Sequence, residues 1–276
     1  MSDWTPGPAW LFCPADRPER YAKALAAADV VILDLEDAVA PANKPAARDA
    51  LQAIVAGGTF DAARTVVRIN ATSSSEHEAD VRLASSLGLP RLMLAKSEDP
   101  ALLAALPHEV VVLVETPLGI ERAVELAAAA NVVALMWGAD DLVAGLGGTG
   151  SRKPDGTYRD VARCARSRAL VAAKANGRLA LDAVHMDIDD IDGLAAECED
   201  AVAVGFDATV AIHPRQVDVI RASYSPAAER VDWAERLLAY VGDDRGVTTF
   251  EGRMVDGPIF QQAERILRLA AATGAQ

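Results

Sequence analysis

The feature of this sequence that most restricts its fold is a series of eight short apolar runs, separated by stretches of helical composition. The runs lie at residues 10–13, 30–35, 65–69, 91–95, 110–114, 132–137, 179–184 and 208–212. Each is almost continuously apolar, as is typical of parallel strands that are buried on both faces. Predicted helices lie between them at residues 18–28, 44–55, 75–87, 99–106, 117–130, 160–176 and 191–204.

This alternation predicts an α/β fold, a (β/α)8 TIM barrel over residues 1–225, with its active site at the carboxyl ends of the strands. An open doubly wound sheet would use the same alternation. However, no Gly-x-Gly-x-x-Gly follows any of the strands, so a nucleotide-binding sheet is poorly supported. The glycines at 145, 147, 148 and 150 lack the Lys-Ser/Thr pair of a phosphate loop, and we expect them to form a flexible loop over the site.

The chain continues well beyond the eighth strand. Residues 227–241 and 258–272 are predicted helices, and residues 242–252 between them are predicted to be a polar loop. A barrel needs only one closing helix. We therefore expect residues 226–276 to form a C-terminal helical extension that contacts a neighbouring subunit or closes over a site.

Charge and composition exclude several classes of partner. The chain has 27 basic and 40 acidic residues, a formal net charge of −13, which argues against nucleic acid. No apolar run reaches the roughly 18 uncharged residues of a membrane span, and the first residues do not resemble a signal peptide. Cys13, Cys164 and Cys198 have no paired metal spacing, which suits a reducing compartment. We expect a cytoplasmic protein without nucleic-acid or membrane partners.

The stretch from Val110 to Asp141 holds two predicted strands with a carboxylate just beyond the end of each. Glu115 follows the first strand, and Gly138, Asp140 and Asp141 follow the second. The segment between them is long enough for a parallel crossover. If the strands are neighbours, Glu115 and Asp141 converge on one point. Two oxygen ligands that leave room for water and substrate indicate a Mg²⁺ site.

Charged and polar side chains also follow most of the other strands: Asp34, Glu36, Asp37, Arg68, Lys96, His185 and His213. Arg68 interrupts an apolar strand, and its guanidinium suits a carboxylate or a developing enolate oxygen. The alternative is a structural ion pair with Glu36 or Asp37. The two histidines are expected to be hydrogen-bonded at the rim.

The three acidic residues after the second strand cannot all act in the same way. Asp34 and Glu36 share one side of the strand because side chains alternate, and Asp37 lies at the turn. At most one of them is expected in direct chemistry. The others would orient Arg68, Lys44 or metal-bound water.

Seven motifs occur in order along the chain: LFCPADRPERYAKAL, VVILDLEDAVAPANKPAAR, VVRIN, VVLVETPLGI, WGADDL, FDATVAIHPRQV and FEGRMVDGPIFQQAERIL. With these motifs the chain closely resembles the citrate lyase β-subunit-like (CitE-like) proteins of the HpcH/HpaI aldolase family, from about Trp10 to Leu267. The resemblance implies a TIM barrel that binds Mg²⁺ and cleaves or forms a carbon–carbon bond in an acyl-CoA or acyl-thioester.

The resemblance also implies roles for individual residues. Glu115 and Asp141 would bind the metal, and Arg68 would hold the oxygen of the keto acid or enolate. Backbone amides of Gly138, Ala139, Asp140 and Asp141 would cradle the keto-acid carboxylate. Asp256, in GRMVDGP, would enter a neighbouring subunit's site as general acid/base, in a homotrimer or a dimer of trimers.

The resemblance leaves several functions open. The first is a stand-alone Mg²⁺-dependent lyase that cleaves a short 3-hydroxyacyl-CoA, of malyl-, citramalyl- or 3-hydroxy-3-methylglutaryl-CoA type, to acetyl-CoA and a keto acid. The second is the β-subunit of a citrate lyase complex that acts on a citryl-thioester. The third is a malyl-CoA thioesterase that uses the same metal site. A non-catalytic protein is hard to reconcile with the presence of Glu115, Asp141 and Arg68.

Overall fold

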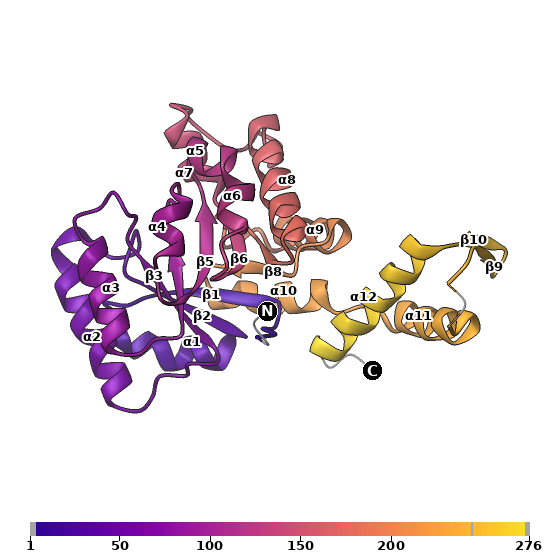
Figure 1. The fold of residues 1–276 in the computed structure, drawn as a ribbon, viewed down its shortest axis with the longest axis horizontal. Coiled ribbons are helices and arrows are strands. Elements are labelled where there is room, and N and C mark those ends of the chain that lie inside the picture. The colour runs from indigo at the N-terminus through magenta and orange to yellow at the C-terminus, as the bar shows by residue number, and fades with distance from the viewer. Residues whose placement is uncertain (1–3, 244, 274–276) are drawn as a thin grey trace. The chain divides into compact units, whose positions relative to one another are not determined.

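A computed structural model describes residues 4–243 and 245–273 of the chain, which divide into two compact units (Figure 1). The first unit ends at Ile220 and the second begins at Arg221. Each unit has its own hydrophobic core.

Eight parallel strands of the first unit close into a barrel in sequence order. They are β1 (Ala9–Pro14), β2 (Val30–Asp34), β3 (Thr65–Ile69), β4 (Arg91–Leu94), β5 (Glu109–Val114), β6 (Val132–Trp137), β7 (Leu179–Asp182) and β8 (Ala208–Ala211). β8 pairs with β1, which closes the barrel. The predicted TIM barrel is therefore confirmed, and each strand lies within two residues of its predicted bounds.

Helices on the outside of the barrel connect successive strands, and α10 follows the last strand (Figure 1). They are α1 (Tyr21–Ala27), α2 (Lys44–Ala56), α3 (His77–Ser86), α4 (Pro100–Ala104), α5 (Pro117–Glu121), α6 (Ala123–Ala127), α7 (Ala139–Gly145), α8 (Asp160–Ala175), α9 (Ile191–Val204) and α10 (Pro214–Tyr224). The single helix expected over residues 117–130 is wrong, because Arg122 leaves the helical conformation between α5 and α6. The short helix α7 was missed, and Gly145 ends it instead of opening a loop.

The barrel interior is filled by every second residue of the strands. Val30 and Ile32 of β2, Val66 of β3, and Val111 and Leu113 of β5 all belong to one buried cluster. This spacing of two follows from the alternation of side chains along a strand. The next inward-facing positions, beyond the apolar layers, are the ones that face the mouth of the barrel.

The second unit pairs two helices with a short hairpin. α11 (Ala228–Val241) and α12 (Gly257–Thr273) pack around Leu237, Phe260 and neighbouring apolar side chains. The polar loop predicted at residues 242–252 is partly wrong, because β9 (Thr248–Phe250) pairs antiparallel with β10 (Arg253–Val255). Glu251 and Gly252 form the turn with φ of 49° and 75°. A two-residue hairpin turn of this type requires positive φ at both residues. Glutamate is rarely found in that conformation, so the sequence does not indicate this turn.

Among the described residues, no helix is both long and apolar enough to cross a membrane.

Candidate active site

The apolar layers of the barrel end in three charged side chains at the carboxyl end of the strands. Two residues after Ile32, Val66 and Leu113 come Asp34, Arg68 and Glu115, so all three continue the inward-facing series. Asp34 lies opposite Arg68 in the register of β2 and β3. All three are buried, with 0%, 8% and 3% of their surface exposed. The mouth of the barrel thus carries charge where an apolar residue would otherwise complete the core.

Arg68 is held on two sides. Its Nε and Nη2 donate to the Asp34 carboxylate at 2.6 and 2.5 Å, and its Nη1 lies 3.3 Å from Glu36 Oε2. The Phe12 ring packs against the guanidinium, with its centroid 4.6 Å from Cζ. Burial opposes the charge, but Asp34 and Glu36 outweigh it and raise the pKa of Arg68 above its ordinary value. The alternative of a structural pair with Glu36 is therefore present, although the main partner of Arg68 is Asp34.

Asp34 is itself fixed by the turn that follows β2. Its carboxylate accepts the backbone N–H groups of Glu36 and Ala38 at 2.8 and 2.9 Å. Lys44 was one of three groups that these acidic side chains could orient, beside Arg68 and metal-bound water. Instead its Nζ donates to the carbonyl oxygens of Leu35 and Glu36 and to the Asn70 amide oxygen. Lys44 thus holds the backbone of the turn, and Asp34 orients Arg68.

Glu115 is packed against the backbone of the neighbouring strand end. Gly138 lies so close that a Cβ on it would be 2.8 Å from Glu115 Oε2, which explains why a glycine is required there. The Lys96 backbone N–H donates to Glu115 Oε1 at 3.0 Å. Burial, followed by the charge of Asp141, raises the pKa of Glu115 to about 8. A buried carboxylate beside a second carboxylate is destabilised in its charged form, so a cation that binds between the two would be favoured.

The two aspartates of the Gly-Ala-Asp-Asp motif face different partners. Both lie in the first turn of α7, directly after Gly138. Asp141 Oδ1 is 3.5 Å from Lys96 Nζ and lines the same cavity as Glu115 and Arg68. Asp140 Oδ1 instead accepts the Ser151 hydroxyl at 2.6 Å, which anchors the loop that follows α7. Because β5 and β6 are neighbours, Glu115 and Asp141 converge as the strand order predicts.

Lys96 is the residue of this site to which the sequence assigned no role. It follows β4 in a left-handed conformation, with φ of 48°. Its Nζ donates to Glu36 Oε1 at 2.5 Å and to Asp37 Oδ2 at 2.8 Å. The sequence showed that Lys96 follows a strand, but it did not predict the left-handed backbone conformation of this residue.

Two cavities join at this end of the barrel. A smaller one of about 150 Å³ is lined by Glu115, Asp141 and Arg68 and by apolar groups such as Leu113 and Met136. A larger one of about 700 Å³ shares Arg68 and Asp141 with it and extends to Arg20 and Lys23. The shared lining makes them one cleft, in which Arg20 and Lys23 line only the larger part and Glu115 only the smaller part.

The donor set fits a Mg²⁺ ion held by few protein ligands. Among the described residues, no group of three or more His, Cys, Asp or Glu could hold a metal by itself. Mg²⁺ keeps several waters and is bound in proteins by one or two carboxylates together with substrate oxygens. Glu115 and Asp141 are such a pair, and they open onto the cleft.

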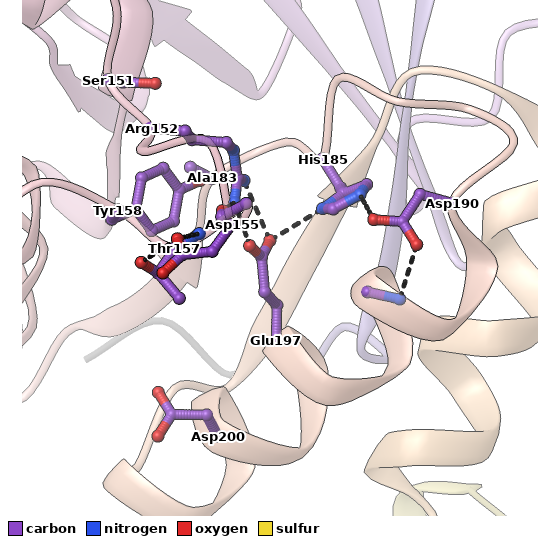
Figure 2. A network of polar contacts seen from close by, with 12 residues as sticks. Ser151, Arg152, Asp155, Thr157, Tyr158, Ala183, His185, Asp190, Glu197 and Asp200 are labelled. Atoms are coloured by element: carbon purple, nitrogen blue, oxygen red, sulfur yellow. Dashed lines mark hydrogen bonds and ion pairs between the residues drawn. The ribbon is translucent and has the colours of Figure 1, made fainter.

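A second polar network supports the rim beside the cleft (Figure 2). Glu197 of α9 lies between Arg152 and His185, and it accepts from Arg152 Nη2 at 3.1 Å and from His185 Nδ1 at 2.9 Å. His185 Nε2 lies 3.2 Å from Asp190 Oδ2 on its other side. The hydrogen bond with Glu197 raises the pKa of His185, and burial opposes this effect. Met186, the next residue, lines both cavities.

Asp256 belongs to the second unit, where it lies between β10 and α12, and its carbonyl oxygen accepts the Phe260 N–H at 3.0 Å. Its role at a neighbouring subunit's site stays a prediction.

His213 Nδ1 accepts the Arg215 N–H at 3.2 Å, as expected for a histidine hydrogen-bonded at the rim.

Replacement of Asp34 by asparagine should destabilise the barrel and release Arg68. The buried guanidinium would lose its anionic partner, and breaking a buried pair in this way costs about 3 to 5 kcal/mol. Denaturant unfolding of Asp34→Asn should show this loss. Asp160→Asn, which removes an exposed pair with Arg163, is the matched control and should leave the free energy of unfolding nearly unchanged, because exposed pairs contribute little. Equal stability of the two variants would contradict this account of Arg68.

The pairing of His185 predicts a pH-dependent contribution to stability. Its pKa is higher in the folded chain than the ordinary value of 6.5, so the stabilisation is complete below that value and is lost as the pH rises through the folded pKa. The difference in free energy of unfolding between wild type and His185→Gln should therefore be larger at low than at high pH. In a Glu197→Gln background this pH dependence should shrink. If the pH dependence is the same in the Glu197→Gln background, Glu197 does not cause the raised pKa of His185.

Comparison with known proteins agrees with the architecture and the motifs. A family model described as HpcH/HpaI aldolase/citrate lyase matches residues 9–214. The citrate lyase subunit beta-like protein of Mycobacterium tuberculosis is 55% identical over 265 residues, 96% of each chain. The mitochondrial citramalyl-CoA lyase of Homo sapiens is 30% identical over 275 residues, which cover 88% of this chain and 79% of that protein.

A solved structure shares the whole architecture. The CitE protein of Mycobacterium tuberculosis, in complex with magnesium, acetoacetate and coenzyme A, superposes with a TM-score of 0.90 and 54% identity. The match covers 97% of this chain and 99% of that chain. Barrel, motifs and family model agree, and the chain belongs to the HpcH/HpaI aldolase/citrate lyase family, in which citrate lyase β-subunits and citramalyl-CoA lyases are carbon–carbon lyases.

Proposed function

We propose that this chain is a stand-alone Mg²⁺-dependent lyase that cleaves a short 3-hydroxyacyl-CoA to acetyl-CoA and a 2-oxo acid. The observation that carries the proposal is the convergence of Glu115 and Asp141 beside the fixed guanidinium of Arg68 in one cleft. The relatives that bind magnesium and coenzyme A or bear the name of an acyl-CoA lyase support the same class.

Glu115 and Asp141 would hold the Mg²⁺. When bound, this ion stabilises negative charge on an oxygen of the substrate, as a Lewis acid does. Without it, the two neighbouring carboxylates would repel the carboxylate of a 2-oxo acid.

Arg68 would stabilise the second oxygen on which charge develops. During cleavage the C3 hydroxyl loses its proton, the C2–C3 bond breaks, and its electron pair passes into the thioester to give an enolate. A guanidinium that Asp34 already orients stabilises that charge without reorganisation. Proton uptake at C2 then yields acetyl-CoA, and the C3 carbon becomes the carbonyl carbon of the 2-oxo acid.

The remaining parts of the substrate match the rest of the cleft. The backbone amides of Gly138 to Asp141, at the start of α7, are candidates to bind the carboxylate of the 2-oxo acid. The larger cavity has room for the thioester arm, and the basic side chains of Arg20 and Lys23 line it. These two cations suit the phosphates of a carrier such as coenzyme A.

Asp256 is proposed to transfer a proton in the site of a neighbouring subunit. Its place in a unit with its own core is compatible with a segment that serves another copy of the chain. The proposal includes a homotrimer or a dimer of trimers, in a cytoplasmic setting.

The first test is release of acetyl-CoA by the purified chain with Mg²⁺ and a panel of 3-hydroxyacyl-CoAs, without partner proteins. Glu115→Gln should lower release more than about 100-fold, beyond the effect of losing an outer-shell partner. EDTA should abolish release. The control Glu78→Gln changes an exposed glutamate on α3 and should not alter the rate. Release of CoA and malate from malyl-CoA without acetyl-CoA would indicate a thioesterase, and activity only with an acyl-carrier subunit would indicate a citrate lyase component.

Asp256→Asn should lower turnover about 100-fold or more, as loss of a general acid/base does, and leave Mg²⁺ affinity unchanged. Mixed oligomers of Asp256→Asn and Glu115→Gln chains test whether it acts on a neighbour. If it does, about one quarter of the sites in randomly mixed oligomers combine an intact barrel with an intact donor, and activity returns in part. No recovery from verified mixed oligomers would assign Asp256 to its own chain.

A further inference from the structure

Lys96 contacts both of the carboxylates that are proposed to hold the metal. Its backbone N–H donates to Glu115 Oε1 at 3.0 Å, and its Nζ lies 3.5 Å from Asp141 Oδ1. The same ammonium is hydrogen-bonded to Glu36 and Asp37 at 2.5 and 2.8 Å. One residue, at the end of β4, therefore links the carboxylates after β2, β5 and β6.

The charges of this cluster do not balance. When every group is ionised, five carboxylates face two cations, an excess of three negative charges: Asp34, Glu36, Asp37, Glu115 and Asp141 against Arg68 and Lys96. Arg68 is committed to Asp34 through two hydrogen bonds. Lys96 is thus the cation that offsets the carboxylates at the open end of the cluster.

The backbone of Lys96 is in a conformation that costs energy. Its φ is 48°, in the left-handed region that is unfavourable for residues other than glycine. That conformation directs the N–H at Glu115 and the side chain at Asp141 from a single position. A glycine would avoid the backbone cost and keep the N–H, but it would have no ammonium.

We propose that Lys96 is a positioning residue that sets the affinity of the site for Mg²⁺. Its N–H orients Glu115, and its ammonium shares Asp141 with the metal and so weakens metal binding. Without metal, the same ammonium keeps the carboxylates together. This inference rests on the proposed function in one respect, namely that Glu115 and Asp141 are the metal ligands.

Lys96→Met, which removes the charge and keeps most of the side-chain length, should bind Mg²⁺ about tenfold more tightly, because a unit positive charge no longer repels the dication in a site open to water. Isothermal titration with Mg²⁺ alone measures this affinity. In EDTA the variant should melt at a lower temperature than wild type, because the acidic cluster has lost its cation. Added Mg²⁺ should raise its melting temperature more than that of wild type.

Three further variants separate the possible causes. Lys153→Met makes the same change at an exposed lysine and should leave Mg²⁺ affinity within about twofold of wild type, since exposed charges are screened. Lys96→Arg keeps the charge and should bind Mg²⁺ as weakly as wild type. Lys96→Gly loses the charge without the left-handed cost and should bind as tightly as Lys96→Met. If Lys96→Met does not fold, Lys96→Gly and Lys96→Arg make the same comparison.

Mg²⁺ affinity in folded Lys96→Met equal to or weaker than that of wild type would overturn the inference. Glu115→Gln distinguishes this failure from failure of the proposed function. If Glu115→Gln abolishes Mg²⁺ binding and Lys96→Met does not strengthen it, only the role of Lys96 is wrong. If Glu115→Gln still binds Mg²⁺ like wild type, the proposed metal site itself is wrong.

Discussion

The buried ion pair between Asp34 and Arg68 is the interaction on which the rest of the site depends. A guanidinium in the mouth of a barrel would cost several kcal/mol without a partner. Asp34 meets this need with two hydrogen bonds to Arg68, and two backbone N–H groups hold Asp34 in turn. Since Arg68 is committed to Asp34 and Glu36, Glu115 and Asp141 need positive charge from elsewhere. Lys96 supplies part of it, and the proposed Mg²⁺ would supply the remainder.

Close approach of the backbone makes that arrangement possible. Gly138 has no side chain, so the carboxylate of Glu115 can lie against it and remain at the end of the cleft. Lys96, in contrast, has a long side chain and approaches Glu115 with its backbone in the left-handed conformation. Strain of this kind persists where the surroundings hold it in place, and such positions are concentrated at functional sites. The geometry at the ends of β4, β5 and β6 is therefore set by backbone conformation as much as by side-chain charge.

The sequence predicted the barrel well and its local irregularities poorly. Strands that are buried on both faces need continuous apolar runs, and these runs are visible in the residues themselves. The break between α5 and α6 is not visible, because no proline or glycine marks it at Arg122. The hairpin of β9 and β10 was missed for a similar reason: its turn places Glu251 at positive φ, where glycine or asparagine would have been the usual signal.

The sequence by itself determined the order of strands and helices, and with it the convergence of Glu115 and Asp141, because neighbouring parallel strands end at the same edge. It also singled out Arg68 as a charged residue in an apolar strand, and the structure shows that this residue faces inward. Only the tertiary structure decided that Asp34 is the main partner of Arg68 and that Lys96 reaches three strand ends. The physical reason is that pairing among several charges depends on distances of a few ångströms between segments far apart in sequence, which periodicity does not encode.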